Sequence, residues 1–393
     1  MRYALKNDLV PSPDVSISKP FAATIAVSSI GDSKDIEINR PKKCVLASHS
    51  GYRLALWLLA AYFLVGSAIT TTAQVVILAR NQDGGNIIVD GSRVYWINRG
   101  NSVVSSVDKL HGGVIRIHNH AGTAVSVNGD IVQDNLNLYF ASQQTPPGRP
   151  FSNFNLYRVP KTSSTVTQLT RDLTGHTNSW DNTLAISNGW LYYFSGFQEV
   201  TWDGFTNYRT IEKISTQGGT PRQVIPLTHT APNISTVYFS VDGVSLDWTD
   251  TTNLSVLRVP LVGGSFSIDN HTVGSPRALS TPTTGPAGGY TFWVEATAAS
   301  KVLKGKRPGG TPLILVNGVV DANLRCFVQV GSFVYCTRAS DFTIVRVPIN
   351  GGAPTVVVNT VGAFLPRGLT SDGTYIYWTA GADHSIRRVP LPP

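Results

Sequence analysis

The chain has 393 residues and a net charge of +8, yet only 14% of its residues are charged. It contains 36 glycines and 23 prolines, which is typical of a turn-rich, all-β protein. The basic residues are scattered and form no stripe with interleaved aromatic residues, so we expect no nucleic-acid partner. The length exceeds what one small sheet around a single core needs, which favours a ring of small sheets.

The first 73 residues differ from the rest of the chain. Residues 1–53 are polar and rich in Ser and Lys, and we expect a disordered leader. Residues 54–73 are apolar, and four basic residues within 40–53 precede them, which orients that end toward the cytoplasm. The apolar segment is either a signal sequence cleaved after Ala73 or a single transmembrane anchor. Both hypotheses place the remainder outside the cytoplasm, secreted, periplasmic or anchored to the cytoplasmic membrane.

A short aromatic sequence motif recurs through residues 74–393. Clear copies are 94–98 (Val-Tyr-Trp-Ile-Asn), 246–250 (Leu-Asp-Trp-Thr-Asp) and 375–379 (Tyr-Ile-Tyr-Trp-Thr). The last aromatic position of each copy, or its substitute, recurs at intervals of 42 to 54 residues, at Trp96, Phe140, Phe194, Trp248, Trp293, Cys336 and Trp378. A repeat of roughly 40–50 residues is the size of one four-stranded propeller blade. We therefore predict an all-β, seven-bladed β-propeller of four-stranded antiparallel blades, with six or eight blades as the alternative counts.

The sixth copy shows the expected order of strands within a blade. Residues 325–330, 333–337, 343–349 and 354–358 are rich in β-branched and aromatic residues and are separated by Gly, Ser and Asn. The third strand of several copies contains Val-Pro, as at Pro348. Because proline cannot donate to a strand ladder, we expect it late in the strand or beside a bulge.

The seventh copy has no fourth strand before the sequence ends at Pro393. Residues 75–78 (Val-Val-Ile-Leu) precede the first aromatic copy as 356–358 (Val-Val-Val) precede the seventh. We therefore predict that the N-terminal strand near residue 75 completes the last blade. This arrangement closes the ring and covers two sheet edges.

Basic residues recur in the third strands. We expect them on solvated edges, where ion pairs contribute little. They are Arg158, Lys213, Arg258, Lys304, Arg346, Arg387 and Arg388.

Two cysteines flank the first predicted hairpin of the sixth copy. Cys326 and Cys336 are ten residues apart, on strands expected to be antiparallel neighbours. That spacing can bring them within disulfide range, and an exported protein favours the oxidised form. We predict a disulfide between them; the alternative is two small buried hydrophobic residues.

The repeated motifs resemble those of the YWTD-type β-propellers, known from LDL-receptor-like (class B) ectodomains and from uncharacterised exported bacterial proteins. The resemblance lies in 95–98 (Tyr-Trp-Ile-Asn), 247–250 (Asp-Trp-Thr-Asp), 377–380 (Tyr-Trp-Thr-Ala) and third strands such as 257–261 (Leu-Arg-Val-Pro-Leu). It covers the whole predicted propeller. It implies an extracytoplasmic binding platform and transfers no ligand-binding residue.

Two copies are longer than the others. Loops over 142–154 and 196–208, with the segment before the third copy, bring together aromatic residues on the face that carries the longer loops. An aromatic cluster of this kind is typical of a recognition patch for a protein or a glycan; the alternative is that the loops pack on one another. The predicted binding residues are Phe151, Phe154, Trp180, Phe197, Trp202, Phe205 and Tyr208.

Histidines on the same predicted face offer a second interpretation. His118, His176 and His229 are weak candidates for a metal or a general base of a hydrolase or lyase. No carboxylate accompanies them at a repeated spacing, so we predict no catalytic residue, no metal and no cofactor. The predicted function is a non-catalytic, extracytoplasmic binding module. Its propeller is expected to be monomeric, with a protein or glycan partner and membrane contact only through residues 54–73.

Overall fold

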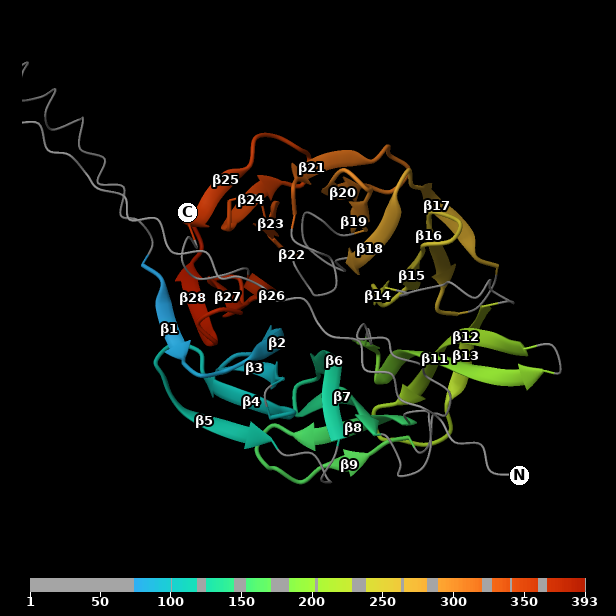
Figure 1. Ribbon diagram of the computed structural model, residues 1–393, viewed down its shortest axis with the longest axis horizontal. Coiled ribbons are helices and arrows are strands. Elements are labelled where there is room, and N and C mark those ends of the chain that lie inside the picture. The colour runs from blue at the N-terminus through green and yellow to red at the C-terminus, as the bar shows by residue number, and fades with distance from the viewer. Residues whose placement is uncertain are drawn as a thin grey trace, which may run out of the picture. The chain divides into compact units, whose positions relative to one another are not determined.

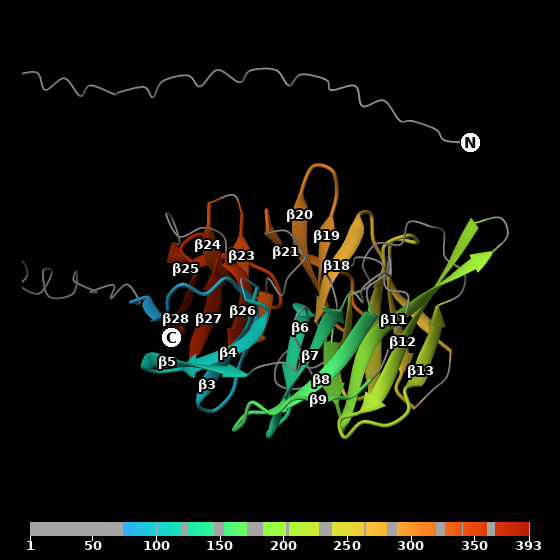
Figure 2. The same ribbon diagram turned by 60° about the horizontal axis from the view of Figure 1, so that its bottom comes forward.

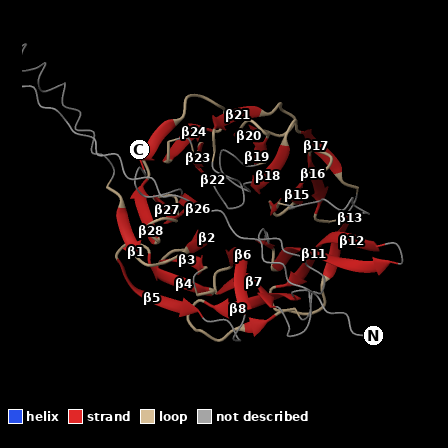
Figure 3. Cartoon of the chain, in the orientation of Figure 1, coloured by secondary structure: helices blue, strands red, loops and turns tan. Residues whose placement is uncertain are grey.

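The computed structural model describes residues 74–99, 101–118, 125–144, 153–170, 184–201, 204–227, 238–262, 265–280, 289–319, 327–339, 341–359 and 366–392. Within these ranges every regular element is a strand (Figure 3). In the same ranges, no helix has the length and apolar character that crossing a membrane requires. The leader and the apolar segment 54–73 lie outside the described residues, and the signal and anchor hypotheses remain predictions.

Seven four-stranded antiparallel sheets, which we number as blades 1 to 7, follow one another around a ring (Figure 1). The predicted fold and blade count are confirmed. Blades 1 to 3 contain β2 (Gly84–Val89), β3 (Arg93–Asn98), β4 (Val103–Asp108) and β5 (Gly112–His118); β6 (Val125–Gln133), β7 (Asn137–Gln144), β8 (Asn153–Pro160) and β9 (Thr167–Gln168); and β10 (Leu184–Ser187), β11 (Trp190–Thr201), β12 (Gly204–Ser215) and β13 (Arg222–Leu227).

The remaining blades have the same order from inner to outer strand. They contain β14 (Phe239–Val241), β15 (Ser245–Asp250), β16 (Ser255–Pro260) and β17 (Ser267–His271); β18 (Ser275–Ser280), β19 (Thr291–Ala296), β20 (Lys301–Lys306) and β21 (Leu313–Asn317); β22 (Phe327–Val330), β23 (Phe333–Arg338), β24 (Thr343–Pro348) and β25 (Thr355–Asn359); and, in blade 7, β26 (Pro366–Ser371), β27 (Tyr375–Ala380), β28 (Ser385–Pro390) and β1 (Val76–Ala79).

Proline ends the third strand in four blades, at Pro160, Pro260, Pro348 and Pro390. The prediction that these prolines sit late in the strand is confirmed. At this position the missing N–H removes no hydrogen bond to the outer strand, because the pairing with the outer strand does not extend to the proline.

The strand β1 completes blade 7, as predicted. It runs antiparallel to β28, with Val76 opposite Arg388 and Ile77 opposite Arg387. Leu78 is buried, and its carbonyl lies so close to Gly112 that a Cβ there would approach it to 2.6 Å. The first strand of the propeller is therefore held from both sides, by the last strand and by blade 1.

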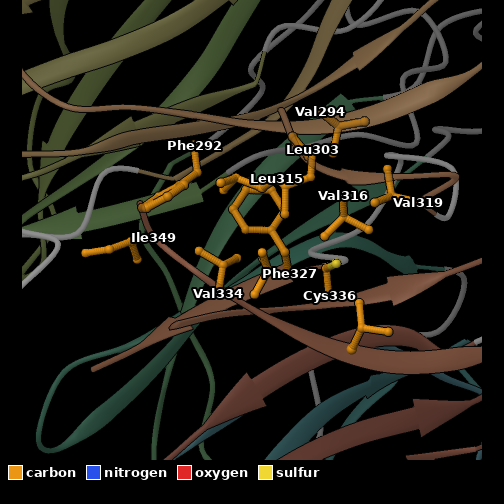
Figure 4. Close-up of a cluster of buried hydrophobic side chains, with 13 residues drawn as sticks. Phe292, Val294, Leu303, Leu315, Val316, Val319, Phe327, Val334, Cys336 and Ile349 are labelled. Carbon is orange, nitrogen blue, oxygen red and sulfur yellow. The ribbon is translucent and has the colours of Figure 1, made fainter. Parts of the chain in front are cut away.

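The core lies between adjacent blades. Each blade buries its aromatic second strand against its neighbour, and the tryptophans Trp96, Trp293 and Trp378 are fully enclosed. Figure 4 shows the cluster between blades 5 and 6, where Phe292 and Leu315 meet Phe327. The aromatic motif therefore recurs because every blade packs against its neighbour through the same surface.

Cys336 belongs to this cluster and is completely buried. Its cross-strand neighbours are Phe327 and Val345. Cys326 lies outside the described residues, so the disulfide remains a prediction.

The expectation that third-strand basic residues are merely solvated is wrong for several of them. Arg158 of blade 2 donates to the carbonyl of Thr216 in blade 3 (3.1 Å), and Arg388 of blade 7 donates to the carbonyl of Leu110 in blade 1 (2.8 Å). The guanidinium carbon of Arg388 also lies 4.3 Å from the ring centre of Tyr375. Both side chains link consecutive blades, and Arg388 is also stabilised by its cation–π contact with Tyr375. Strand alternation in the sequence carries no information about distances between blades.

Candidate binding surface on blades 2 and 3

Five blades have hairpins of one length between their second and third strands. From the first residue of the second strand to the last of the third, each contains sixteen residues: 93–108, 245–260, 291–306, 333–348 and 375–390. Each has two six-residue strands and a four-residue connection. The last connecting residue has a positive φ in four of them, at Ser102, Leu254, Phe342 and His384. Non-glycine residues rarely adopt this conformation, so the short turn has a defined and repeated geometry.

Blades 2 and 3 depart from this length. The corresponding segment is 24 residues in blade 2 (137–160) and 26 in blade 3 (190–215). In blade 2 the connection 145–152 accounts for part of the excess and lies outside the described residues. In blade 3 the excess lengthens both strands to twelve residues. The added chain therefore falls on two consecutive blades, at the face where the other blades have their short turns.

The extension of blade 3 is a β-ribbon, where the sequence predicted a loop over 196–208. The strands β11 and β12 pair without a register shift from Trp190↔Ser215 to Thr201↔Gly204. We call residues 196–208 the ribbon. Its far end projects beyond the other strands of blade 3 (Figure 2) and lies outside the ring in the view of Figure 1.

A local signal in the sequence indicates this ribbon. Asp203 and Gly204 are flanked by 200–202 (Val-Thr-Trp) and 205–206 (Phe-Thr). Asp-Gly between strand-forming residues is a strong indication of a tight hairpin. The surrounding Gly, Gln, Glu and Asn residues weaken the strand pattern, and the segment reads as a loop when composition alone is considered.

The strand pair that carries the ribbon is fixed by contacts of two aromatic residues, Tyr193 and Trp190, of which Tyr193 is fully buried. The hydroxyl of Tyr193 donates to Glu212 Oε2 at 2.6 Å, across the same strand pair. Burial and this carboxylate raise the pKa of Tyr193 far above its usual value, so the tyrosine remains a donor. Lys213 Nζ and the guanidinium of Arg222 lie 5.1 and 5.4 Å from the ring centre of Trp190. The ribbon thus begins on a rigid support.

A buried carboxylate connects the inner strands of the first three blades. Asp130 Oδ1 accepts from Asn86 Nδ2 of blade 1 (3.3 Å), and Asp130 Oδ2 accepts from the backbone N–H of Leu184 in blade 3 (3.4 Å). Asp130 is 4% exposed. Blade 2 is therefore anchored to both neighbours, which fixes the relative positions of the two blades with long hairpins.

The structure positions the backbone of four predicted binding residues. Phe154 lies in β8, opposite Gln143, while Phe197 and Tyr208 are cross-strand partners in the ribbon. Phe205 pairs with Val200. Phe151, Trp180 and Trp202 lie outside the described residues. The proposed patch thus remains a prediction; its backbone is partly strand and not loop.

His118, one of the weak metal candidates, is a buried residue at the end of β5 and not a loop residue. Its Nε2 lies 3.1 Å from Ser106 Oγ, and its Nδ1 lies 3.2 Å from the carbonyl oxygen of Ser163 in blade 2. Burial lowers its pKa and favours the neutral ring. In the described part of the chain, no three His, Cys, Asp or Glu residues are grouped as metal ligands. His176 and His229 lie outside the described residues.

No protein-family model and no curated protein matches the chain. Among solved structures it is similar to a streptogramin B lyase, with 15% identity, a TM-score of 0.55 and coverage of 81% of this chain and 98% of that one. It is also similar to a catalytically inactive virginiamycin B lyase from Staphylococcus aureus with quinupristin, at 15% identity and a TM-score of 0.53, covering 81% of this chain and 99% of the other. At this identity the likeness shows the fold alone: the chain is a member of the β-propeller fold.

Proposed function

We propose that the chain is a non-catalytic binding module that acts outside the cytoplasm and recognises a protein or a glycan through the long hairpins of blades 2 and 3. The observation that carries the proposal is the excess of eight and ten residues over the sixteen-residue hairpin of the other five blades. Added chain on a rigid scaffold is where propellers and other repeat folds acquire recognition surfaces.

The composition of the added chain fits recognition of this kind. The ribbon contains Phe197, Trp202, Phe205 and Tyr208 and has no Lys or Arg. Aromatic residues are enriched among those that dominate binding energy, because they contribute large contact areas at a small entropic cost. The far end of the ribbon lies outside the ring (Figure 1), where it can reach a macromolecular surface.

Location outside the cytoplasm rests on the N-terminal sequence. The apolar segment 54–73 follows a basic stretch, and the propeller begins at β1 immediately after it. Both a cleaved signal and an anchor deliver β1 to the far side of the membrane. N-terminal sequencing of the protein purified from its own cells tests this step: a start at Gln74 supports cleavage, and a start at Met1 in a cytosolic fraction contradicts export.

The binding surface is tested by Trp202→Ala combined with Phe205→Ala. Parent and variant are immobilised and probed with a glycan array and with protein extracted from the source cells. We expect the double variant to keep its melting temperature and to lose capture. The matched control is Phe266→Ala, because Phe266 is an aromatic residue 58% exposed on blade 4. Equal capture by parent and double variant would show that the patch is not the binding surface.

A further inference from the structure

The outer edges of all seven blades are interrupted. In six blades a register shift breaks the pairing between the outer strand and its neighbour, and in blade 2 the outer strand β9 has only two residues. Bulges and short edge strands are the means by which β proteins prevent unwanted strand addition. The perimeter of the ring is therefore protected against edge-to-edge association.

The ribbon lacks this protection. The strands that form it, β11 and β12, pair continuously, with no register shift in their twelve residue pairs. Among the described strands, β10 pairs with β11 only as far as Tyr193, so no described strand pairs with residues 195–201 of β11. This edge contains no proline and no lysine, the residues that commonly block strand addition. The edge of β12 is shorter, since β13 pairs with it from Arg209 onward.

The direction of the free backbone groups follows from a bond at the root of the hairpin. The N–H of Thr216 donates to the carbonyl of Gly189 at 3.0 Å. Bonded and non-bonded pairs alternate along an antiparallel ladder. Counting from this bond, the even-numbered residues Gly196, Gln198 and Val200 direct their N–H and C=O groups toward the free edge.

We propose that residues 195–201 of β11 form a strand-addition edge that pairs with the same edge of a second copy of this chain. An antiparallel strand can pair with its own copy about a two-fold axis perpendicular to the sheet, and such two-fold interfaces are the commonest in homo-oligomers. The ribbon projects beyond the other strands of blade 3 (Figure 2).

The pairing that uses the whole free edge is centred on Gln198. It sets Gln198 against Gln198 and Gly196 against Val200 of the second copy. Glu199, the single charged residue of the edge, then faces Phe197 and not another Glu199. Direct opposition of like charges, which destabilises strand pairs, is thereby avoided. The inference rests on backbone groups, although Phe197 of the proposed aromatic patch lies on the same edge. It replaces the expectation of a monomeric propeller.

Gln198→Pro tests the edge, because proline removes the central outward N–H and leaves the bonds between β11 and β12 in place. The matched control Gln198→Ala keeps that N–H. Sedimentation velocity of the full chain over a range of concentrations measures the association. We expect dimers for the parent and for Gln198→Ala, and monomers for a folded Gln198→Pro. A monomeric parent, or a Gln198→Pro protein that dimerises like the parent, would overturn the proposal.

A cross-linking experiment decides the matter if Gln198→Pro fails to fold. Two central residues of a hydrogen-bonded antiparallel pair have Cα atoms about 5.5 Å apart, within the range of a disulfide. Gln198→Cys should therefore give a cross-linked dimer under mild oxidation. Asn207→Cys, on the other strand of the ribbon, would lie about 14 Å from its counterpart, three strand spacings away, and should not. Equal cross-linking of the two variants, or none in either, would contradict pairing along β11.

Discussion

Lys109 Nζ lies 2.8 Å from Asp372 Oδ2 and joins blade 1 to blade 7, the two blades at which the ring closes. Asp372 also accepts from the backbone N–H of Thr374 and Tyr375 and from the hydroxyl of Tyr377. A similar pair, Lys161–Asp90 at 3.1 Å, joins blade 2 to blade 1. The carboxylate therefore orders a hairpin within its own blade and holds the neighbouring blade.

We expect Lys109→Met to lower the free energy of unfolding by about 1–3 kcal/mol, because the pair is mostly buried and removal of one partner leaves a charge without its counterion. Chemical denaturation at pH 7 measures the effect. The hydrogen bonds and Lys109 lower the pKa of Asp372 against the effect of burial. The contribution of ionised Asp372 to the free energy of unfolding is therefore complete above the ordinary aspartate pKa, and it is lost as the pH falls below that value. Arg338→Met, which breaks the more exposed Arg338–Asp341 pair, should cost less than about 1 kcal/mol.

The closing strand gives a second prediction. Leu78 is 4% exposed between β28 and blade 1. Leu78→Ala should lower the free energy of unfolding by about 2–4 kcal/mol through lost burial and the cavity left behind. Val114→Ala, at an 89% exposed position of the adjacent strand β5, should change it by less than about 0.5 kcal/mol. Equal effects at the two positions would show that β1 does not close the ring.

In blades 1, 2 and 7 a tyrosine of the second strand donates its hydroxyl to an aspartate of the preceding turn, as Tyr95 does to Asp90, Tyr139 to Asp134 and Tyr377 to Asp372. Blade 4 departs from this arrangement. Asp247 occupies the position of Tyr95, Tyr139 and Tyr377, and its oxygens accept from Arg258 Nε (2.7 Å) and Nη2 (3.1 Å). Arg258 also lies 3.9 Å from Asp242. Burial raises the pKa of Asp247 to about 6, although the bonds from Arg258 act in the opposite direction.

The raised pKa predicts an unusual dependence of stability on pH. Folded Asp247 binds a proton more tightly than unfolded Asp247, whose pKa is near 3.8. Its contribution to stability is therefore complete below pH 4 and declines as the pH rises to about 6. Asp247→Asn removes this decline, so the stability of the variant minus that of the parent should increase by about 2 kcal/mol from pH 4 to pH 6. A difference that stays constant across this range in denaturation experiments would contradict the pKa shift.

The sequence was sufficient to predict the ring, because each blade must bury the same face and therefore repeats the same pattern. The repeated tryptophans Trp96 and Trp378 lie in the second strands of blades 1 and 7, as the repeat predicts. The strand near residue 75 pairs with β28, the third strand of blade 7. Local rules also placed the prolines at strand ends.

Two features could not be predicted in this way. The carbonyl partner of Arg388 belongs to Leu110, 278 residues earlier in the chain, and no local pattern records such a contact. The sequence predicts a loop over 196–208 because Gly196, Gln198 and Asn207 interrupt its strand-forming residues. The segment is nevertheless a pair of strands, because β11 and β12 pair continuously. This pairing depends on the register of the two strands and not on their composition.

Shortening the hairpin of blade 3 tests the proposed function most directly. Residues 196–209 are replaced by the four-residue connection 251–254 (Thr-Thr-Asn-Leu) of blade 4, which restores the sixteen-residue length because Ser195 pairs with Thr210 as Asp250 pairs with Ser255. Binding of parent and shortened protein to the same glycan array and cell extract is then compared. We predict an unchanged melting temperature and loss of binding; a shortened propeller that folds and still binds as the parent does would contradict the account.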